Sequence, residues 1–317
     1  MNQIPSASPY ITVEERKMLM KHNNVRATLE LAFHLFLIFA SFFLIHLYPS
    51  VFTILPALFL LGGQQLALAI LMHDSSHHSV FSNKAVNDFV GNWFGAYPLF
   101  NHMPSYRPYH QTHHLTAGTI EDPDLALTRG YPTTKMSMVR KFTRDLLGIT
   151  GFKSTSSLIL MSMGFLTYTQ AGTVEWAKKG GRKVNWRGVI GPVVVNVLLF
   201  VILAVLFDPR MYLIWLLAHF TTFQFCARVR AIAEHSMVDD PTDPNRNTRT
   251  TKAKFIERLL FAPYNVNYHL EHHMIMTVPS YNLPKMHKLL VERGFYEKGL
   301  MAKGYFEVIK MTVQKLK

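Results

Sequence analysis

The chain has 317 residues, of which 49% are hydrophobic and only 17% are charged. Soluble domains carry about 25% charged residues, so this composition argues against an ordinary soluble protein and favours one that lies largely within a membrane. The formal net charge is +13, and the single cysteine, Cys226, excludes an internal disulfide or a thiolate metal cluster.

The first predicted elements are two apolar helices. Residues 1–26 are polar and charged, and we do not expect them to be a secretory signal peptide, because no apolar core lies near the start. Apolar runs then occupy 27–47 and 51–72, and each is close to the ~20 residues that a helix needs to cross a bilayer. The short link Tyr48–Ser50 predicts that they form a hairpin.

A second pair of apolar runs occupies 188–207 and 212–233, joined by the short link Asp208–Met211. The last run carries Arg228 and Arg230 near its end, so we expect its final turns to leave the bilayer. The pattern predicts an all-α integral membrane protein with four transmembrane helices in two hairpins.

The distribution of charge predicts the orientation of these helices. Of the 33 Lys and Arg residues, the two hairpin links hold only Arg210. Because basic residues mark the cytoplasmic side, both termini and the long segment 73–187 are predicted to be cytoplasmic. This bias also accounts for the net charge without nucleic acid, for which the sequence contains no recognition motif.

The long segment is partly apolar. Val86–Phe100 is aromatic and is predicted to be a helix lying in the membrane interface. Leu146–Thr167 is interrupted by glycines and a lysine, and we also interpret it as interfacial. If it crossed the bilayer, the histidines described next would lie on opposite faces of the membrane.

Ten of the sixteen histidines fall in four places: the motifs HDSSHH, HQTHH and HLEHH, and one position just past the fourth apolar run. These residues are His73, His77, His78, His110, His113, His114, His235, His269, His272 and His273. On a helix, residues three and four apart share a face, so each HxxHH motif projects its imidazoles together. All four places lie at or beyond the predicted cytoplasmic ends of helices, where polar clusters indicate function.

Clustered imidazoles indicate a metal site. Neutral imidazole suits iron, zinc, copper and nickel, and eight to ten imidazoles exceed what one metal ion can use. Two irons with five or six ligands each would use the set and leave room for O2. Nearby carboxylates are candidates to orient the ligands by accepting their second N–H. They are Asp74, Asp122, Asp124, Glu234 and Glu271.

Two points stay open within this set. Either His77 or His78 serves as the second ligand of the first motif, and His77 is slightly preferred because it lies one turn from His73. The remaining histidines have no cluster partners in the sequence and are interpreted as packing residues. They are His22, His34, His46, His102, His219 and His287.

The three motifs, their order and their relation to the apolar runs resemble the membrane fatty-acid desaturase and hydroxylase family across residues 27–273. The tail, which contains PSYNLPKMHKLL, is similar to bacterial members. The resemblance implies a single domain over 1–317, with four spans and a cytoplasmic helical cap that holds two irons. It also implies O2 as co-substrate, His235 as an additional ligand, and a location in a bacterial inner membrane.

At two positions the chain departs from the pattern of particular subgroups of this family. Acyl-CoA desaturases place an asparagine four residues before the ligand at the end of the fourth span, where this chain has Ala231, which argues against that subgroup. Front-end desaturases replace the first histidine of the third motif with glutamine and often carry a fused cytochrome b5. Here His269 is present and no HPGG haem motif occurs. Electrons are therefore expected from a separate ferredoxin, rubredoxin or cytochrome b5.

The sequence thus predicts an O2-dependent desaturase that acts on a fatty-acyl or lipid chain. The alternatives are a hydroxylase or ketolase of a fatty acid, carotenoid or other hydrophobic substrate on the same scaffold, and, more remotely, a membrane metal-binding or transport protein. Transport would place ligands within the spans, whereas these histidines lie outside them. The sequence leaves open whether the substrate is an acyl-lipid, a thioester or a small amphiphile.

Overall fold

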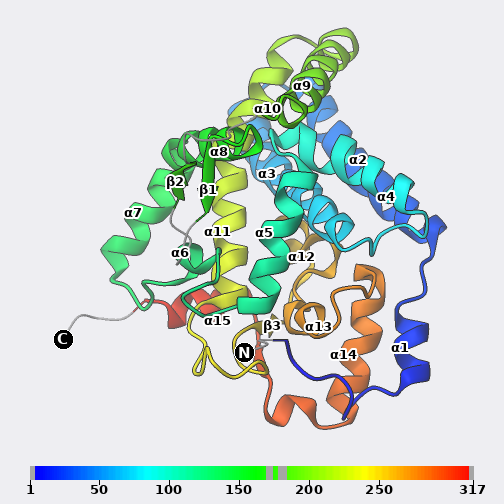
Figure 1. Cartoon of the computed structure of the whole chain (residues 1–317). Helices are drawn as coiled ribbons and strands as arrows, with labels where there is room; N and C mark the ends of the chain where they lie inside the picture. Colours follow the sequence, from blue (N-terminus) through cyan, green and yellow to red (C-terminus); the bar gives the residue numbers. More distant parts are fainter. Residues whose placement is uncertain (1–3, 169–173, 178–183, 314–317) are drawn as a thin grey trace.

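The computed structural model describes residues 4–168, 174–177 and 184–313, and it is predominantly helical (Figure 1). The α-helices of the first half are α1 (Val13–Leu19), α2 (Asn24–Leu47), α3 (Val51–Ser76), α4 (Lys84–Val90), α5 (Met103–Thr116), α6 (Leu125–Thr128), α7 (Lys135–Leu146) and α8 (Ile149–Ser162). Those of the second half are α9 (Arg187–Leu206), α10 (Arg210–Phe220), α11 (Thr222–His235), α12 (Phe255–Leu260), α13 (His269–Met274), α14 (Leu283–Glu292) and α15 (Tyr305–Met311). A π-helix, η1 (Gly91–Ala96), and the 3-10 turns η2 (Tyr97–Leu99), η4 (Pro263–Asn265), η5 (Ser280–Asn282) and η6 (Phe295–Glu297) complete the helical elements.

Three helices are long and apolar enough to cross a membrane: α2, α3 and α9, with 24, 26 and 20 residues. Their positions confirm three of the four predicted runs. Side-chain caps fix where the first two begin, because Asn23 accepts a hydrogen bond from Arg26 N and Ser50 accepts one from Thr53 N. Helix α3 continues to Ser76, past the end of its apolar run, so His73 lies on the helix itself.

The fourth predicted run, 212–233, is not one continuous helix, so a fourth membrane-spanning helix is not confirmed. The chain breaks at Thr221, and the resulting α10 and α11 have 11 and 14 residues, each shorter than a bilayer-crossing helix. The threonine hydroxyls at the break bond to carbonyl oxygens: Thr221 Oγ1 donates to Leu217 O at 2.5 Å, and Thr222 Oγ1 donates to Leu58 O at 2.6 Å. These bonds stabilise a change of direction that apolar periodicity does not reveal.

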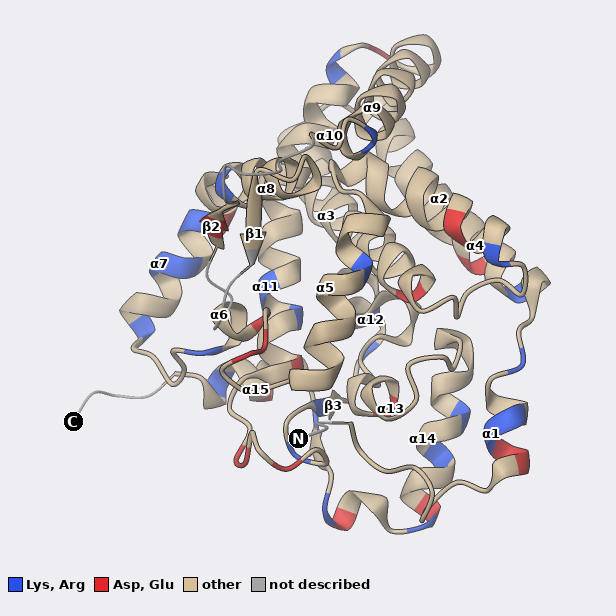
Figure 2. Cartoon of the chain, viewed as in Figure 1, with Lys and Arg blue, Asp and Glu red and all other residues tan. Residues whose placement is uncertain are grey.

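The C-terminal end of α9 packs against α2. Phe207, the residue that follows α9, has its ring centre 5.7 Å from that of His46 and 5.5 Å from that of Phe39, both on α2. Helices α1, α13, α14 and α15 gather at the opposite end of the molecule (Figure 1). Figure 2 shows Lys and Arg on α1, α7 and α14, whereas α3 and α9 carry almost none.

Helix α3 is the centre of the fold. Of its apolar stretch of 18 residues, 67% are buried, whereas the corresponding shares are 22% for α2 and 17% for α9. Its glycines allow close approach by neighbouring backbones. A Cβ on Gly63 would lie 2.4 Å from Leu259 O and 2.9 Å from Leu260 Cα, neither of which can rotate away. This residue therefore fixes where the segment that leads into α13 docks on α3.

Replacing Gly63 with alanine is expected to destabilise the protein by about 1–3 kcal/mol, because backbone atoms must move to admit the Cβ. The lowered midpoint of thermal unfolding in detergent measures the effect. Gly304→Ala is the matched control, because its backbone is extended at φ 171° and a Cβ there meets only Glu257 Oε1 at 3.7 Å. Equal midpoints for the two variants would contradict the docking role of Gly63.

The segments predicted to be interfacial are helical but interrupted. Val86–Phe100 divides into α4, η1 and η2, and Gly91 and Gly95 lie against α3. Helix α8, within 146–167, has 14 residues and is about 21 Å long, less than the ~30 Å hydrocarbon core. Its placement at the interface stays a prediction.

The expectation of an all-α fold needs one correction, because the described residues include two small sheets. Strands β1 (Leu166–Tyr168) and β2 (Val174–Trp176) pair antiparallel, with Leu166 opposite Trp176. Strands β3 (Arg249–Thr251) and β4 (Leu300–Ala302) pair parallel, with Arg249 opposite Leu300. The second sheet ties the stretch after α11 to the C-terminal region, close to the histidines.

Candidate metal centre

Nine of the ten predicted ligand histidines come together in two clusters. The first histidine group consists of His73, His77, His110, His114 and His272. The second histidine group consists of His113, His235, His269 and His273. Within each group the potential ligand nitrogens lie within 4.8 Å of one another, and every ring except the half-buried His235 is buried.

Each HxxHH motif supplies both groups. On α5, His110 and His114 are four residues apart and join the first group, while His113 faces the second. On α13 the pattern is reversed, because His269 and His273 join the second group and only His272 joins the first. Two motifs that each contribute to both groups hold the groups next to each other: the rings of His114 and His273 lie 4.2 Å apart.

The structure places His77, and not His78, in the first histidine group. Helix α3 ends at Ser76, His77 caps it, and the chain then turns with φ +55° at His78. This turn directs His78 away from the first group and toward Asp88, at 3.5 Å, with 32% of its side chain exposed. Of the ten predicted ligands, only His78 is outside both groups.

The spacing between imidazole nitrogens fits shared coordination. His114 Nε2 lies 3.1 Å from His110 Nε2 and 3.2 Å from His272 Nε2, and His235 Nε2 lies 2.8 Å from His269 Nε2. Metal–imidazole bonds of about 2.1 Å at right angles would place neighbouring nitrogens about 3.0 Å apart. The nitrogens in each group are therefore spaced closely enough to bind a common ion.

Burial keeps these imidazoles in the form that binds metal. It lowers the pKa of His77 to about 3 and holds the pKa values of His272 and His273 well below their ordinary value. Neutral imidazole is the ligand form of histidine. The Nε2 atoms of His73, His77 and His273 are buried and have no hydrogen-bond partner within the described part of the chain, and a bound metal ion would satisfy them.

Four of the five predicted carboxylates contact the histidines. Asp74 Oδ1 lies 2.7 Å from His73 Nδ1, and Asp122 Oδ1 lies 2.8 Å from His113 Nδ1. Asp124 is 3.7 Å from the same nitrogen of His113, and Glu234 Oε1 is 3.5 Å from His269 Nδ1. Contact at Nδ1 leaves Nε2 free for a metal and fixes the orientation of the ring.

His113 differs from its neighbours electrostatically. Burial alone would lower its pKa, but the hydrogen bond with Asp122 and the charge of Asp124 raise it above the ordinary value overall. Asp122 also accepts hydrogen bonds from the backbone N–H groups of Gly118 and Asp124, at 2.9 and 2.8 Å. The loop after α5 therefore holds Asp122 rigidly against the second group.

Glu271 makes no hydrogen bond or ion pair with either group among the described residues, and its predicted role is corrected. Its fully buried carboxylate accepts hydrogen bonds from His287 Nδ1 at 2.5 Å, from Tyr296 Oη and from Thr250 Oγ1. These partners belong to α14, η6 and β3. Glu271 thus anchors helix α13 to its surroundings, and His287, interpreted from sequence as a lone packing residue, is one of its anchors.

Three more residues at the centre were missed by the sequence reasoning. Arg230 pairs with Glu234 at 2.7 Å, a relation that its i, i+4 spacing signals. Tyr106 stacks on His110 with ring centres 5.1 Å apart, also at i, i+4. Arg249 donates to Ala233 O, Ser236 O and Met237 O and so holds the end of α11 that carries His235, which no local pattern indicates.

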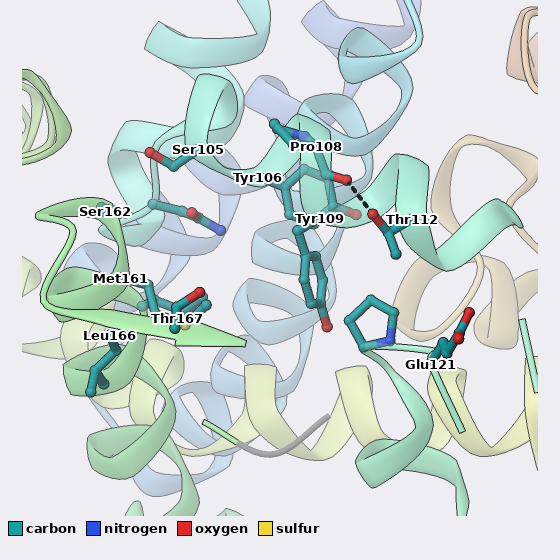
Figure 3. Close-up of a pocket in the computed structure, with 13 residues that line it drawn as sticks. Ser105, Tyr106, Pro108, Tyr109, Thr112, Glu121, Met161, Ser162, Leu166 and Thr167 are labelled. Atoms are coloured by element: carbon teal, nitrogen blue, oxygen red, sulfur yellow. Dashed lines mark hydrogen bonds between the residues drawn. The ribbon is translucent and has the colours of Figure 1, made fainter. Parts of the chain in front are cut away.

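A cavity of about 520 Å³, the outer cavity, lies beside α5 (Figure 3). Helix α5 forms one wall through Ser105, Tyr106 and Tyr109, and α8 and β1 face it with Met161 and Leu166. Because Tyr106 lines the cavity and stacks on His110, a molecule in the cavity would lie within one side chain of the histidines.

Known proteins match the chain over most of its length. The profile of the family described as "Fatty acid desaturase" matches residues 49–303. A relative from Bradyrhizobium elkanii, named dihydrorhizobitoxine desaturase, is 27% identical over 78% of this chain and 72% of its own. A relative from Caenorhabditis elegans, named Delta(5) fatty acid desaturase fat-4, is 24% identical over 84% of this chain and 62% of its own.

The matched region contains all nine clustered histidines, and the family profile extends over well more than half of the chain. The chain belongs to the fatty acid desaturase family.

Proposed function

We propose that this protein is an integral membrane enzyme that uses two irons, O2 and electrons from a separate protein to introduce a double bond into an acyl or other lipid-like substrate. The observation that carries the proposal is the pair of adjacent groups of five and four imidazoles, all buried except the half-buried His235. Both relatives named above are desaturases, which supports the type of reaction.

The donor set fits iron. Five imidazoles in the first group and four in the second suit ions with five or six ligands better than tetrahedral zinc, which takes four. We infer that each group holds one iron. When bound and reduced, such a centre supplies the O2 chemistry that removes hydrogen from unactivated C–H bonds.

The protein's own residues would orient the ligand rings, shield the centre from water and bind the substrate. Asp74 and Asp122 fix the rings of His73 and His113 through Nδ1. Burial of the rings keeps water from the reacting atoms. The outer cavity would present the substrate beside Tyr106 and His110.

We further propose that the whole chain, 1–317, is one domain. In it α2, α3 and α9 cross a bacterial inner membrane, and the broken pair α10–α11 forms the fourth crossing. The histidines and both termini would then be cytoplasmic, which the single basic residue in the hairpin links supports. The net charge of +13 would attract an acidic ferredoxin, rubredoxin or cytochrome b5 as electron donor.

The proposal is tested by expressing the chain in an aerobic bacterial host beside a His272→Ala variant and comparing extracted lipids by mass spectrometry. A desaturase yields a species about 2 mass units lighter that is absent from the variant. A species about 16 units heavier would instead identify a hydroxylase. Wild-type protein that yields no new species and binds no iron would overturn the proposal.

Replacing Asp122 with asparagine is expected to weaken iron binding at the second group by about 10- to 100-fold, because His113 loses the carboxylate that orients it. The loss of affinity is measured as the iron content that the protein retains at increasing chelator concentration. Glu121→Gln is the control, since Glu121 is the exposed neighbour and contacts no histidine of either group among the interactions described. A curve for Asp122→Asn that overlies the wild type would contradict this role.

A further inference from the structure

Helix α7 turns an apolar side away from the rest of the protein. Its inner side holds Met138 and Asp145, both buried, and Asp145 forms an ion pair with Arg228 of α11. The outer side, which continues onto the start of α8, carries large apolar residues whose exposed fractions range from 39% to 73%. These residues, the α7–α8 stripe, are Met136, Val139, Leu146, Leu147, Ile149 and Phe152. A single exposed apolar residue is ordinary, but a continuous run indicates a partner.

Basic side chains border the stripe (Figure 2). Segment 135–153 contains five basic residues and one acidic residue, Asp145, which is already paired. Four of the five basic residues are exposed and form no ion pair within the described part of the chain: Lys135, Arg140, Arg144 and Lys153. On α14, by contrast, Lys288 pairs with Glu292 at 3.8 Å. The positive charge beside the stripe is therefore unbalanced and open to an anionic partner.

The stripe adjoins the apolar surface of α10. Phe152 stacks on Phe220, the last residue of α10, with ring centres 4.3 Å apart, and a Cβ on Gly151 would lie 2.3 Å from Phe220 O. Helix α10 in turn exposes Leu213 and Leu217. The α7–α8 stripe therefore continues the exposed apolar surface of a helix that we propose to lie in the bilayer, at the end from which α11 leads to the histidines.

A basic surface with an apolar centre fits either an acidic protein or an anionic membrane, and two observations favour the membrane. The stripe is continuous with α10, which is expected to contact lipid. Its apolar residues and the arginines beside them also have the arrangement of an interfacial helix, which buries its apolar side about 5–10 Å deep and keeps its basic residues among the headgroups. The planar guanidinium groups of Arg140 and Arg144 match phosphate oxygens.

We propose that α7 and the start of α8 lie in the headgroup layer of the leaflet on the side of the histidines and bind anionic phospholipids there. The α7–α8 stripe would enter the acyl layer, while Arg140 and Arg144 hold lipid phosphates. Because α8 also contributes Leu158 and Met161 to the outer cavity, this attachment would hold the cavity wall near the headgroups. The inference goes beyond the proposed reaction and does not depend on it.

The test measures which lipids surround α7. A fluorophore is attached at Val139→Cys, and Cys226, the single native cysteine, is buried and does not compete for the label. The full-length protein is placed in phosphatidylcholine nanodiscs that contain either phosphatidylglycerol or phosphatidylcholine with a quenching doxyl group near the top of the acyl chain. Quenching at increasing mole fraction of each doxyl lipid gives its association constant, and the ratio of the anionic to the zwitterionic constant is the lipid preference.

We expect both lipids to quench the label at Val139→Cys, with the anionic lipid preferred by about 3- to 10-fold, because basic residues at the surface attract negative headgroups. The preference should fall below about twofold in Arg140→Gln/Arg144→Gln and should weaken with added salt. Lys285→Gln/Lys288→Gln, which removes two exposed charges from α14, is the matched control and should leave the preference unchanged. A label at Val291→Cys, an exposed valine on α14, should be quenched by neither lipid.

A label at Val139→Cys that neither lipid quenches would overturn the proposal and leave an acidic protein as the partner of this surface. Equal quenching by the two lipids, or a preference that survives the loss of Arg140 and Arg144, would overturn it as well. Because the fluorescence is read without turnover, its result is independent of the proposed function, which is judged by bound iron and lipid products. A protein that desaturates a host lipid but shows no lipid preference at α7 would keep its function and lose this inference.

Discussion

Replacing His114 with alanine is expected to lower the iron content of the purified protein by at least about 10-fold and to abolish formation of the oxidised lipid. His114 is fully buried, and its Nε2 lies 3.1 Å from that of His110 and 3.2 Å from that of His272. Removing it takes a nitrogen from the middle of the first group. Metal analysis of protein purified in detergent, with concentration measured independently, checks the result.

His78→Ala is the matched control, because it removes a histidine from the same cluster of motifs without touching either group. His78 turns toward Asp88, and 32% of its side chain is exposed. Iron content and activity should stay within about twofold of the wild type. If His78→Ala lost as much iron as His114→Ala, the division of the histidines described above would be incorrect.

The sequence predicts the parts of this fold that depend on local periodicity. Apolar runs of about 20 residues predicted α2, α3 and α9, because the requirement to satisfy every backbone group in lipid leaves few alternatives to a helix. The HxxHH spacing likewise predicted that imidazoles on α5 and α13 would cluster. These inferences need only the geometry of a single helix.

Tertiary contacts decide what local periodicity does not. The break at Thr221 depends on a hydroxyl of Thr222 reaching Leu58, 164 residues away in the sequence. The division of each HxxHH motif between two groups depends on where α11 and α13 sit relative to α5. The one-turn spacing from His73 favoured His77 only slightly over His78, and the difference became clear once the end of α3 was located at Ser76.

Glu271 shows most clearly that a local sequence pattern does not determine tertiary contacts. Its place inside the HLEHH motif suggested a direct contact with a ligand, but on α13 it points to the side opposite the two groups, toward Thr250, His287 and Tyr296. Three donors from three separate elements converge on one fully buried carboxylate. The position of α13, and with it three of the nine clustered histidines, therefore depends on this residue.

Replacing Glu271 with leucine is expected to destabilise the protein by about 3–5 kcal/mol, because three buried donors lose their acceptor at once. Since α13 supplies histidines to both groups, iron should be lost from both sites and not from one. The measurements are the thermal unfolding midpoint in detergent and the iron content of the protein that remains folded.

Glu271→Gln separates the hydrogen-bonding role from the charge. The glutamine carbonyl can still accept from His287 and Tyr296, and its amide can donate to the hydroxyl of Thr250, so most of the stability and iron should be retained. Glu297→Ala, an exposed carboxylate on the neighbouring η6, controls for loss of charge in this region. A leucine variant as stable and as rich in iron as the glutamine variant would show that α13 is held by packing alone. The clustering of His269, His272 and His273 would then owe nothing to the carboxylate that lies between them in the sequence.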